Sequence, residues 1–330
     1  MSERVVLALE TSCDETAVAI LRGRELLASE VASQAGIHAE FGGVVPEVAS
    51  RNHLRVLRPL LERAMESAQV SIADIDAYAA TRGPGLASSL LIGTAAAKGL
   101  ALTTGRFYIG VNHLEGHLIS PFFGGWLKPS VGLVVSGGHT LLIDIEGFGR
   151  YHLLGGTVDD AAGEAFDKVG KMLGLSYPAG PEVNRLASAG DPKAYVFPRS
   201  MMESGDFSFS FSGLKTSVRY MLPKLRTYRI EDLCASFQEA IVDVLIAKTL
   251  RAAENRGRKT IALSGGVSCN TRLRERFTSA CESHGLELLM AEPRLCTDNA
   301  AMIGFVAAMN LARGEFSPIT LDIDPNLRLA

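Results

Sequence analysis

The chain has 330 residues, of which 47% are hydrophobic and 21% are charged, a balance typical of a globular protein long enough for two domains. No apolar run approaches the roughly 20 residues of a membrane span, and the start, MSERVVLALE, is unlike a secretory signal, so we expect a cytoplasmic protein with no membrane partner. The net charge of −3 argues against strong, nonspecific binding to nucleic acid.

The first half of the chain predicts a β-hairpin followed by alternating strands and helices. Two β-rich runs flank a polar turn in residues 5–21, and another strand is expected near residues 25–32. Apolar residues at helical spacing predict a helix over residues 47–69. A strand ending in the Gly-Pro-Gly turn at residues 83–85 follows, and then a helix rich in small residues over residues 86–105. These elements together indicate one α/β unit.

The second half of the chain repeats this order. Residues 130–147 again predict a strand, a polar turn and a strand, and a third strand is expected near residues 151–154. Residues 258–277 predict a strand, a Gly-Gly turn and a helix, and the last strong helix begins at the Thr-Asp-Asn cluster of residues 297–299. The two halves share the pattern and little sequence identity, so the pattern alone indicates a duplicated α/β unit.

A duplicated unit of this kind predicts two lobes with a cleft between them. Strand-end turns from both lobes would face the cleft, where their backbone N–H groups can hold phosphate. We place the N-terminal lobe at residues 1–110, completed by the C-terminal helix near residues 298–330. The C-terminal lobe, with most of the nucleotide and metal contacts, is placed at residues 111–297. The expected fold is therefore a two-lobed α/β nucleotide-binding protein.

Two histidines in the segment VNHLEGHLIS are candidate metal ligands. Residues four apart on a helix differ by about 40° in direction, so His113 and His117 would lie on one face and could share a metal at about 2 Å. The alternative is that the spacing is coincidental and that the two histidines are simply polar residues at a helix cap and on the protein surface. Glu115 lies about 200° around the helix from His113, so the glutamate arrangement of zinc peptidases is not reproduced and a metallopeptidase is disfavoured.

Asp298 is the candidate third ligand of this metal. It lies at the start of the final helix, where the helix dipole stabilises a carboxylate. Two imidazoles need at least one more protein ligand, and a carboxylate is a suitable one. The alternative is that Asp298 is an ordinary helix N-cap.

Two glycine turns are candidate phosphate sites. VVSGGHT, at residues 134–140, and LSGGVSCN, at residues 263–270, both follow apolar strands and allow an anion to approach the backbone closely. Their matching positions at strand ends favour nucleotide binding. The sequence contains neither the Walker motif nor G-x-G-x-x-G, which excludes P-loop and Rossmann chemistry.

Other polar residues have a functional and a structural interpretation each. Asp167 falls inside an amphipathic helix predicted within residues 157–181, where it could bind ribose or be solvated or ion-paired. Lys215 could contact phosphate or an RNA backbone. The basic segments 219–229 and 251–259 are local nucleic-acid patches or solvated surfaces. The cysteines form no C-x-x-C pair, so we expect free thiols; they are Cys13, Cys234, Cys269, Cys281 and Cys296.

Seven motifs in order carry a family resemblance over essentially the whole chain. They are LALETSCDETAVAI, NHLEGHL, VVSGGHT, DDAAGEAFDKVGKMLGLSYPAGP, SFSFSGLKT, LSGGVSCN and CTDNAAMIG. Together they closely resemble TsaD, the family of bacterial tRNA N6-adenosine threonylcarbamoyltransferases formerly described as glycoproteases or O-sialoglycoprotein endopeptidases.

The resemblance implies a fold and a reaction. The fold is the two-lobed actin-like, Hsp70-like ATPase (ASKHA) fold of duplicated RNase H-like units, with nucleotide and metal in the interlobe cleft. The reaction is a metal-dependent acyl transfer of threonylcarbamoyl from L-threonylcarbamoyladenylate to N6 of adenosine 37 in tRNAs that read codons beginning with A, with release of AMP. It also implies one divalent metal per subunit, Fe²⁺ or Zn²⁺, and binding of ATP or ADP.

The resemblance also assigns residues and partners. His113, His117 and Asp298 match the metal ligands, and Asp14 and Glu15 match acids that matter for activity. The positions matching the donor-binding residues are Ser136, Gly137, Gly138, His139, Asp167, Gly180 and Asn270. The implied partners are tRNA carrying A37, a paralogous TsaB-type protein, a small TsaE-type ATPase, and a threonylcarbamoyl-AMP synthase as the source of the donor.

Two departures from the family pattern and one alternative function remain. Ala179 stands where the family has glycine, and we expect only a modest effect because Gly180 is retained. The ending LDIDPNLRLA differs from the commoner basic tail. A nucleotide-dependent actin-like or chaperone-like binding module would share the fold, but it would have no use for a His/His/Asp cluster.

Overall fold

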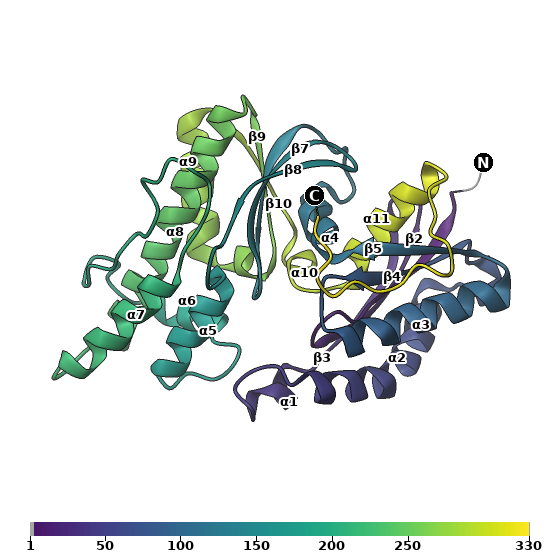
Figure 1. Cartoon of the computed structure of the whole chain (residues 1–330), viewed down its shortest axis with the longest axis horizontal. Helices are drawn as coiled ribbons and strands as arrows, with labels where there is room; N and C mark the ends of the chain where they lie inside the picture. The colour runs from purple at the N-terminus through teal and green to yellow at the C-terminus, as the bar shows by residue number, and fades with distance from the viewer. Residues whose placement is uncertain (1–2, 330) are drawn as a thin grey trace. The chain divides into compact units, whose positions relative to one another are not determined.

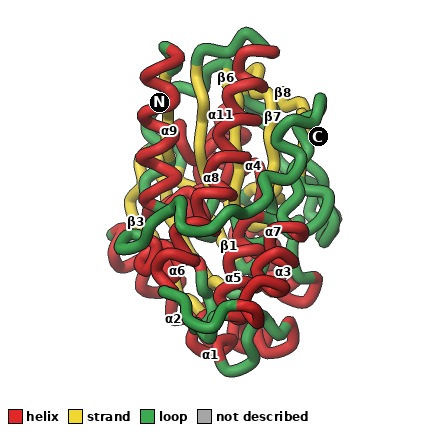
Figure 2. The backbone as a smooth tube through the Cα atoms, turned by 90° about the vertical axis from the view of Figure 1, so that its left-hand side faces the viewer, coloured by secondary structure: helices red, strands yellow, loops and turns green. Residues whose placement is uncertain are grey.

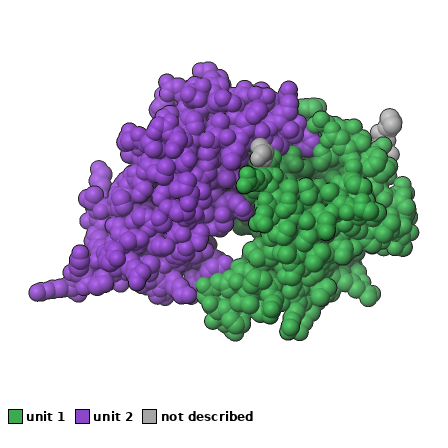
Figure 3. Space-filling view, in the orientation of Figure 1, with its two compact units in different colours: residues 1–126, 297–329 green, residues 127–296, 330 purple. Residues whose placement is uncertain are grey.

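The computed structural model describes residues 3–329 and divides the chain into two compact units (Figures 1 and 3). Unit 1 contains residues up to 126 together with 297–329, and unit 2 contains residues 127–296. None of the helices described over these residues is long and apolar enough to cross a membrane.

The division differs from the boundary predicted after residue 110. Helix α4 (His113–Ile119) belongs to unit 1, because it follows the edge strand of that sheet and packs tightly on helix α11 (Ala300–Ala312). A Cβ atom at Gly116 of α4 would lie only 3.0 Å from Met302 Cγ of α11. The candidate ligands His113, His117 and Asp298 therefore all lie in unit 1, so the boundary after residue 110 and the placement of the two histidines in the C-terminal lobe are corrected.

Unit 1 is built on a five-stranded mixed sheet in the order β3-β2-β1-β4-β5. The predicted hairpin is present, since β1 pairs antiparallel with β2 and β2 with β3, whereas β4 and β5 are parallel to β1. The strands are β1 (Val5–Glu10), β2 (Glu15–Arg22), β3 (Glu25–Ser33), β4 (Ala77–Gly83) and β5 (Phe107–Asn112).

Helices cover both faces of this sheet (Figure 1). Helices α2 (Pro46–Ala68) and α3 (Ala87–Thr104) lie on one face, where Leu7 and Leu9 of β1 join their apolar residues in one core cluster. Because side chains alternate along a strand, Ala8 points to the opposite face, which α11 covers. This explains why the apolar run of β1 is buried throughout.

Unit 2 repeats the architecture of unit 1. Its sheet, read as β8-β7-β6-β9-β10, has the same order of hairpin, third strand and two parallel strands, so the predicted duplication is confirmed. The strands are β6 (Ser130–Val135), β7 (Thr140–Gly147), β8 (Arg150–Gly156), β9 (Thr260–Ser264) and β10 (Glu287–Met290).

The helices of unit 2 gather on its sheet around one apolar core. Phe166 and Phe237 meet edge to face within this core, and Val131, Leu133 and Leu263 of the sheet pack with them. Figure 2 shows the helices and strands of the chain in red and yellow. The helices of unit 2 are α5 (Ala162–Met172), α6 (Gly180–Ala187), α7 (Ser212–Met221), α8 (Ile230–Asn255), α9 (Thr271–His284) and the short α10 (Pro293–Cys296).

The C-terminal tail of unit 1 lies across the ends of β4 and β5. Asp324 N donates to Arg82 O at 2.8 Å, and Asn112 Nδ2 donates to Arg328 O at 3.0 Å. Backbone groups of the tail make both contacts, so its side chains can differ from the common family ending without losing them. The tail therefore contacts Asn112, the residue just before His113.

Asp144 on β7 should be a main electrostatic contributor to the stability of unit 2. It is 1% exposed and accepts hydrogen bonds from Arg256 Nε (2.9 Å) and Arg258 Nε (2.6 Å). Burial raises the pKa of Asp144, but the hydrogen bonds from Arg258 and Arg256 outweigh it and hold the pKa below its usual range. The basic segment 251–259 thus has part of its charge paired within the fold.

We predict that Asp144→Asn lowers the free energy of unfolding by about 2 kcal/mol at pH 7. A carboxyl with a lowered folded-state pKa stabilises the fold above its ordinary pKa, 3.8, and loses that contribution as the pH falls further. Urea unfolding should therefore show wild type and variant converging in strong acid. Glu146→Gln, at a half-buried position near the end of the same strand, is the control and should change the free energy of unfolding little. An Asp144→Asn variant as stable as wild type would contradict the prediction.

Candidate metal centre and donor loop

The two histidines lie on a short helix that is fixed at its first residue. Strand β5 ends at Asn112, whose side chain caps α4 by accepting a hydrogen bond from Leu114 N at 2.8 Å. His113 is therefore the first residue of α4, and His117 follows one turn later, as predicted. Both side chains are buried, with ring centroids 4.7 Å apart and planes at 89°.

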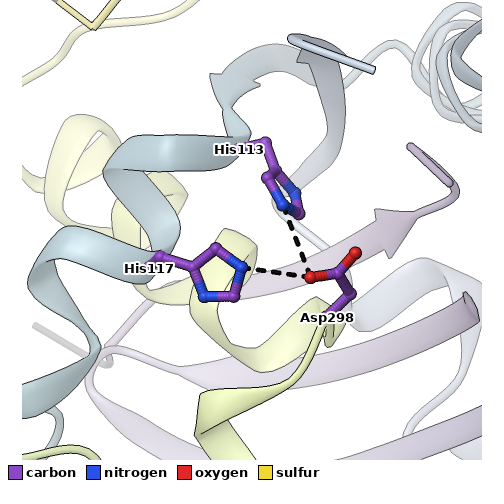
Figure 4. A group of neighbouring side chains, drawn as sticks. All are labelled: His113, His117 and Asp298. Atoms are coloured by element: carbon purple, nitrogen blue, oxygen red, sulfur yellow. Dashed lines mark hydrogen bonds and ion pairs between the residues drawn. The ribbon is translucent and has the colours of Figure 1, made fainter. Parts of the chain in front are cut away.

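Asp298 reaches these imidazoles from the other end of the chain (Figure 4). Its Oδ1 lies 3.0 Å from Nε2 of His117 and 3.4 Å from Nε2 of His113. The N-cap of α11 is Asn299, whose side chain accepts from Met302 N at 2.9 Å. The alternative interpretation of Asp298 as the helix cap is therefore wrong.

The three side chains have the composition and spacing of a mononuclear metal site. One ligand atom from each of His113, His117 and Asp298 lies within 4.8 Å of the others. Two imidazole nitrogens and one carboxylate oxygen suit Zn²⁺ or Fe²⁺ and leave coordination positions for a substrate. The residues present thus fit the metal that the sequence predicts.

The electrostatics of the cluster favour a positive charge. Burial lowers the pKa of His113, but the charges of Asp298 and Glu10 outweigh it and raise that pKa well above its usual value. Burial likewise raises the pKa of Asp298, but His113 and His117 hold it well below its usual range. A cation at this position meets the same carboxylates that stabilise the imidazolium.

Of the two acids predicted from the first hairpin, Asp14 lies in the turn between β1 and β2, and Glu15 is the first residue of β2. Ser33 Oγ donates to Glu15 Oε1 at 3.0 Å, and Gln34 N donates to Asp14 O at 3.0 Å. Burial and then the charges of Asp298 and Asp14 raise the pKa of Glu15 to about 9. The structure therefore brings Glu15 within electrostatic reach of Asp298.

In unit 2, the turn between β6 and β7 forms a compact loop. Ser136 N donates to His139 O at 2.8 Å, and His139 N donates to Ser136 Oγ at 3.2 Å. Gly163, in the first turn of α5, packs directly on this loop: a Cβ there would lie 2.5 Å from Ser136 O and 2.7 Å from Gly137 Cα. The loop thus depends on a close approach that only glycine allows.

The other predicted donor residues also organise turns in unit 2. Asp167 Oδ1 accepts from Ala179 N at 2.7 Å, which fixes the turn before Gly180. Ala179 has φ −86°, an ordinary value, so replacing the family glycine introduces no backbone strain.

Asn270 caps α9 and connects to a pocket of about 260 Å³. Its Oδ1 accepts from Leu273 N at 3.0 Å, and its Nδ2 donates to Gln238 Oε1 at 2.6 Å. Gln238 lines the pocket together with Asn184 of α6 and Thr271 of α9. The pocket therefore lies beside one of the predicted donor residues.

Two residues of the site were not anticipated from the sequence, and one candidate is already paired. Lys215 Nζ lies 3.0 Å from Asp160 Oδ2, so part of its charge is compensated within unit 2, and its contact with phosphate or RNA stays a prediction. The sequence reasoning missed Gly163, whose role depends on a tertiary contact. It also missed Glu10, whose Oε2 lies 3.0 Å from His113 Nδ1. Glu10 could have been noticed from the sequence, because it is an ionisable residue at the end of the apolar run VVLALE, a strand expected to be buried.

Comparison with known proteins gives the family. The model of the family described as tRNA N6-adenosine threonylcarbamoyltransferase, TsaD, matches residues 25–305. The chain belongs to this family. The family enzyme of Thermotoga neapolitana is 48% identical over 98% of this chain and 99% of its own length. That of Clostridium perfringens is 46% identical over 100% and 99%.

Solved structures show that this TsaD-family chain has the actin-like ATPase fold. Full-length HypF, in a phosphate- and nucleotide-bound form, has a TM-score of 0.65 at 13% identity over 96% of this chain and 57% of its own. Component A of the Acidaminococcus fermentans (R)-2-hydroxyglutaryl-CoA dehydratase has a TM-score of 0.57 at 16% identity, over 94% and 99%. At these identities the likeness concerns the fold alone.

We predict that His117→Ala weakens Zn²⁺ binding by more than about 100-fold, because it removes one of three protein ligands. Competition with a chromophoric chelator measures the affinity. His152→Ala is the matched control, since His152 is an exposed histidine on β8 paired with Glu146. Equal zinc affinity in the two variants would show that His117 is not a ligand.

We predict that Gly163→Ala weakens ADP binding by about tenfold or more, because displacing the backbone of the loop costs about 1–3 kcal/mol. Isothermal titration calorimetry gives the affinity. Gly99→Ala, a helical glycine of α3 with open space around the new methyl group among the described residues, serves as the control. Unchanged ADP affinity in Gly163→Ala would contradict the proposed use of this loop.

Proposed function

We propose that this chain transfers the threonylcarbamoyl group from L-threonylcarbamoyladenylate to N6 of adenosine 37, in tRNAs that read codons beginning with A, and releases AMP. The observation that carries the proposal is the cluster of two buried histidines, His113 and His117, with the half-buried Asp298, in a chain whose full-length relatives are named as this transferase. A purely nucleotide-driven binding module gives that cluster no role.

The donor is an activated mixed anhydride, so the enzyme needs no covalent nucleophile. It must hold the adenylate, polarise the carbamoyl group and position the adenine amine. We assign the adenylate to the loop of unit 2, whose glycines leave room for a phosphate. The residues proposed to bind it are Ser136, Gly137, Gly138, His139, Asp167, Gly180 and Asn270. The pocket beside Asn270 and the packing of α5 on the loop support this assignment.

We assign one divalent cation, Fe²⁺ or Zn²⁺, to His113, His117 and Asp298. When bound, such an ion supplies Lewis-acid polarisation of the donor's oxygens. The chain's own contribution is to hold three candidate ligand atoms close together in a largely buried cluster, with the negative charge that a cation requires.

Proton transfer completes the reaction. As the N6–carbon bond forms, the bond from carbon to the phosphate oxygen breaks, AMP leaves with that electron pair, and the amine gives up a proton. Glu15 is our candidate for the proton acceptor. The charge of Asp298 helps to raise the pKa of Glu15 to about 9, so a bound cation that offsets this charge would favour the ionised form of Glu15, which accepts the proton. Asp14, its neighbour, contributes to that raised pKa.

We propose that the chain acts in the cytoplasm and with partners. Adenosine 37 must leave the stack of the anticodon loop to reach the donor, as single-stranded RNA readers commonly require. The net charge of −3 suits shared rather than independent tRNA binding. The family resemblance supports a TsaB-type paralogue, a TsaE-type ATPase that uses ATP, and a threonylcarbamoyl-AMP synthase.

The test is incorporation of carbon-14 threonine into an A-decoding tRNA, with the synthase and both partner proteins present. We expect incorporation by wild type and by His152→Ala, and a loss of at least about 100-fold in His113→Ala. The metal content of each preparation is measured in parallel. No incorporation by folded, metal-loaded wild type would contradict the transferase, and full incorporation by a metal-free His113→Ala would make the histidines structural.

A further inference from the structure

Glu10, the last residue of β1, is a buried carboxylate beside the metal cluster. It is 0% exposed. Its Oε2 lies 3.0 Å from His113 Nδ1 and accepts from Thr81 Oγ1 at 2.6 Å. Its Oε1 accepts from Ser12 N at 2.5 Å. Groups from β4, α4 and the β1–β2 turn therefore hold this one side chain.

The fold itself does not require a carboxylate at this position. In unit 2 the last residue of the corresponding strand β6 is Val135, which is fully buried in the core. Burying a carboxylate costs free energy unless it is paired and hydrogen-bonded, whereas an apolar residue gains free energy on burial. The presence of Glu10 is therefore best understood from what it contacts.

The contact with Glu10, which is shorter than the 3.3 Å from Ser12 Oγ to the same Nδ1, favours one nitrogen of His113 as the free one. A carboxylate at Nδ1 favours the form of the imidazole that carries its proton there, so the lone pair is on Nε2. Nε2 is the atom that faces Asp298 Oδ1, at 3.4 Å. His117 differs, because its buried Nδ1 has no hydrogen-bond partner among the described residues. Among the described residues, a carboxylate therefore lies at Nδ1 of His113 but not at Nδ1 of His117.

We propose that Glu10 is a positioning residue of the metal centre. Its carboxylate accepts the Nδ1–H of His113, fixes the ring with Nε2 toward the metal, and adds negative charge behind the ligand. Thr81 in turn fixes Glu10. This inference rests on the proposed metal centre and adds to it a residue that contacts neither the metal nor the substrate.

The test is the affinity of the purified full chain for Zn²⁺, measured by chelator competition, with the visible spectrum of the Co²⁺-loaded protein as a second readout. We expect Glu10→Gln to raise the Zn²⁺ Kd by about 10–100-fold and to alter the Co²⁺ spectrum. Glu10→Asp, which keeps the charge, should recover part of the affinity. Thr81→Val, which keeps the side-chain shape, should shift the Kd in the same direction by less.

Asp144→Asn is the matched control, because it also removes a buried carboxylate and destabilises the fold but lies in the other unit. It should leave the Zn²⁺ Kd and the Co²⁺ spectrum unchanged. If Glu10→Gln does not fold, Thr81→Val alone decides the question. If the Glu10 and Thr81 variants have the same Zn²⁺ Kd and the same Co²⁺ spectrum as wild type, the role of Glu10 is overturned and the proposed metal centre is not. Failure of the wild type to bind Zn²⁺ or Co²⁺ would overturn both.

Discussion

The return of the chain to unit 1 is the constraint on which the candidate metal centre depends. Helix α11 begins more than 180 residues after α4 but packs on the same sheet, and Gly304 allows it to approach closely, because a Cβ there would lie 2.3 Å from Leu21 Cδ1. This packing brings Asp298 to the two imidazoles. Two histidines on α4 alone would be an incomplete site, so the ligand set exists only when both ends of unit 1 have folded together.

The duplicated architecture carries different chemistry in its two copies. In unit 1 the first strand ends in Glu10, the turn after it contains Asp14, and the next strand begins at Glu15. In unit 2 the equivalent turn contains Gly137 and Gly138, and the strand ends in Val135. We propose that one copy therefore concentrates negative charge for a cation and that the other exposes backbone for an anion. The same fold can serve both purposes because the turns extend from the sheet without changing its core.

Much of the fold could be predicted because hydrophobic alternation and helical spacing are local signals. They gave the hairpins, the repeated order of elements and the helical placement of His113 and His117. The domain boundary could not be predicted in this way, because the spacing of α4 does not say which sheet it packs on. Glu10 and Gly163 were missed for the same reason: each acts through a residue more than 25 positions away in sequence. The proximity of Asp298 to the two histidines could be predicted because two imidazoles need a third ligand, and the resemblance to the family supported it.

Anomalous X-ray diffraction from crystals grown with Zn²⁺, measured on both sides of the zinc absorption edge, tests the central claim most directly. The account predicts one strong peak in unit 1, at about 2.0–2.2 Å from Nε2 of His113, Nε2 of His117 and Oδ1 of Asp298. A peak coordinated by other side chains, or no peak at these three residues in protein shown to be fully zinc-loaded, would contradict it.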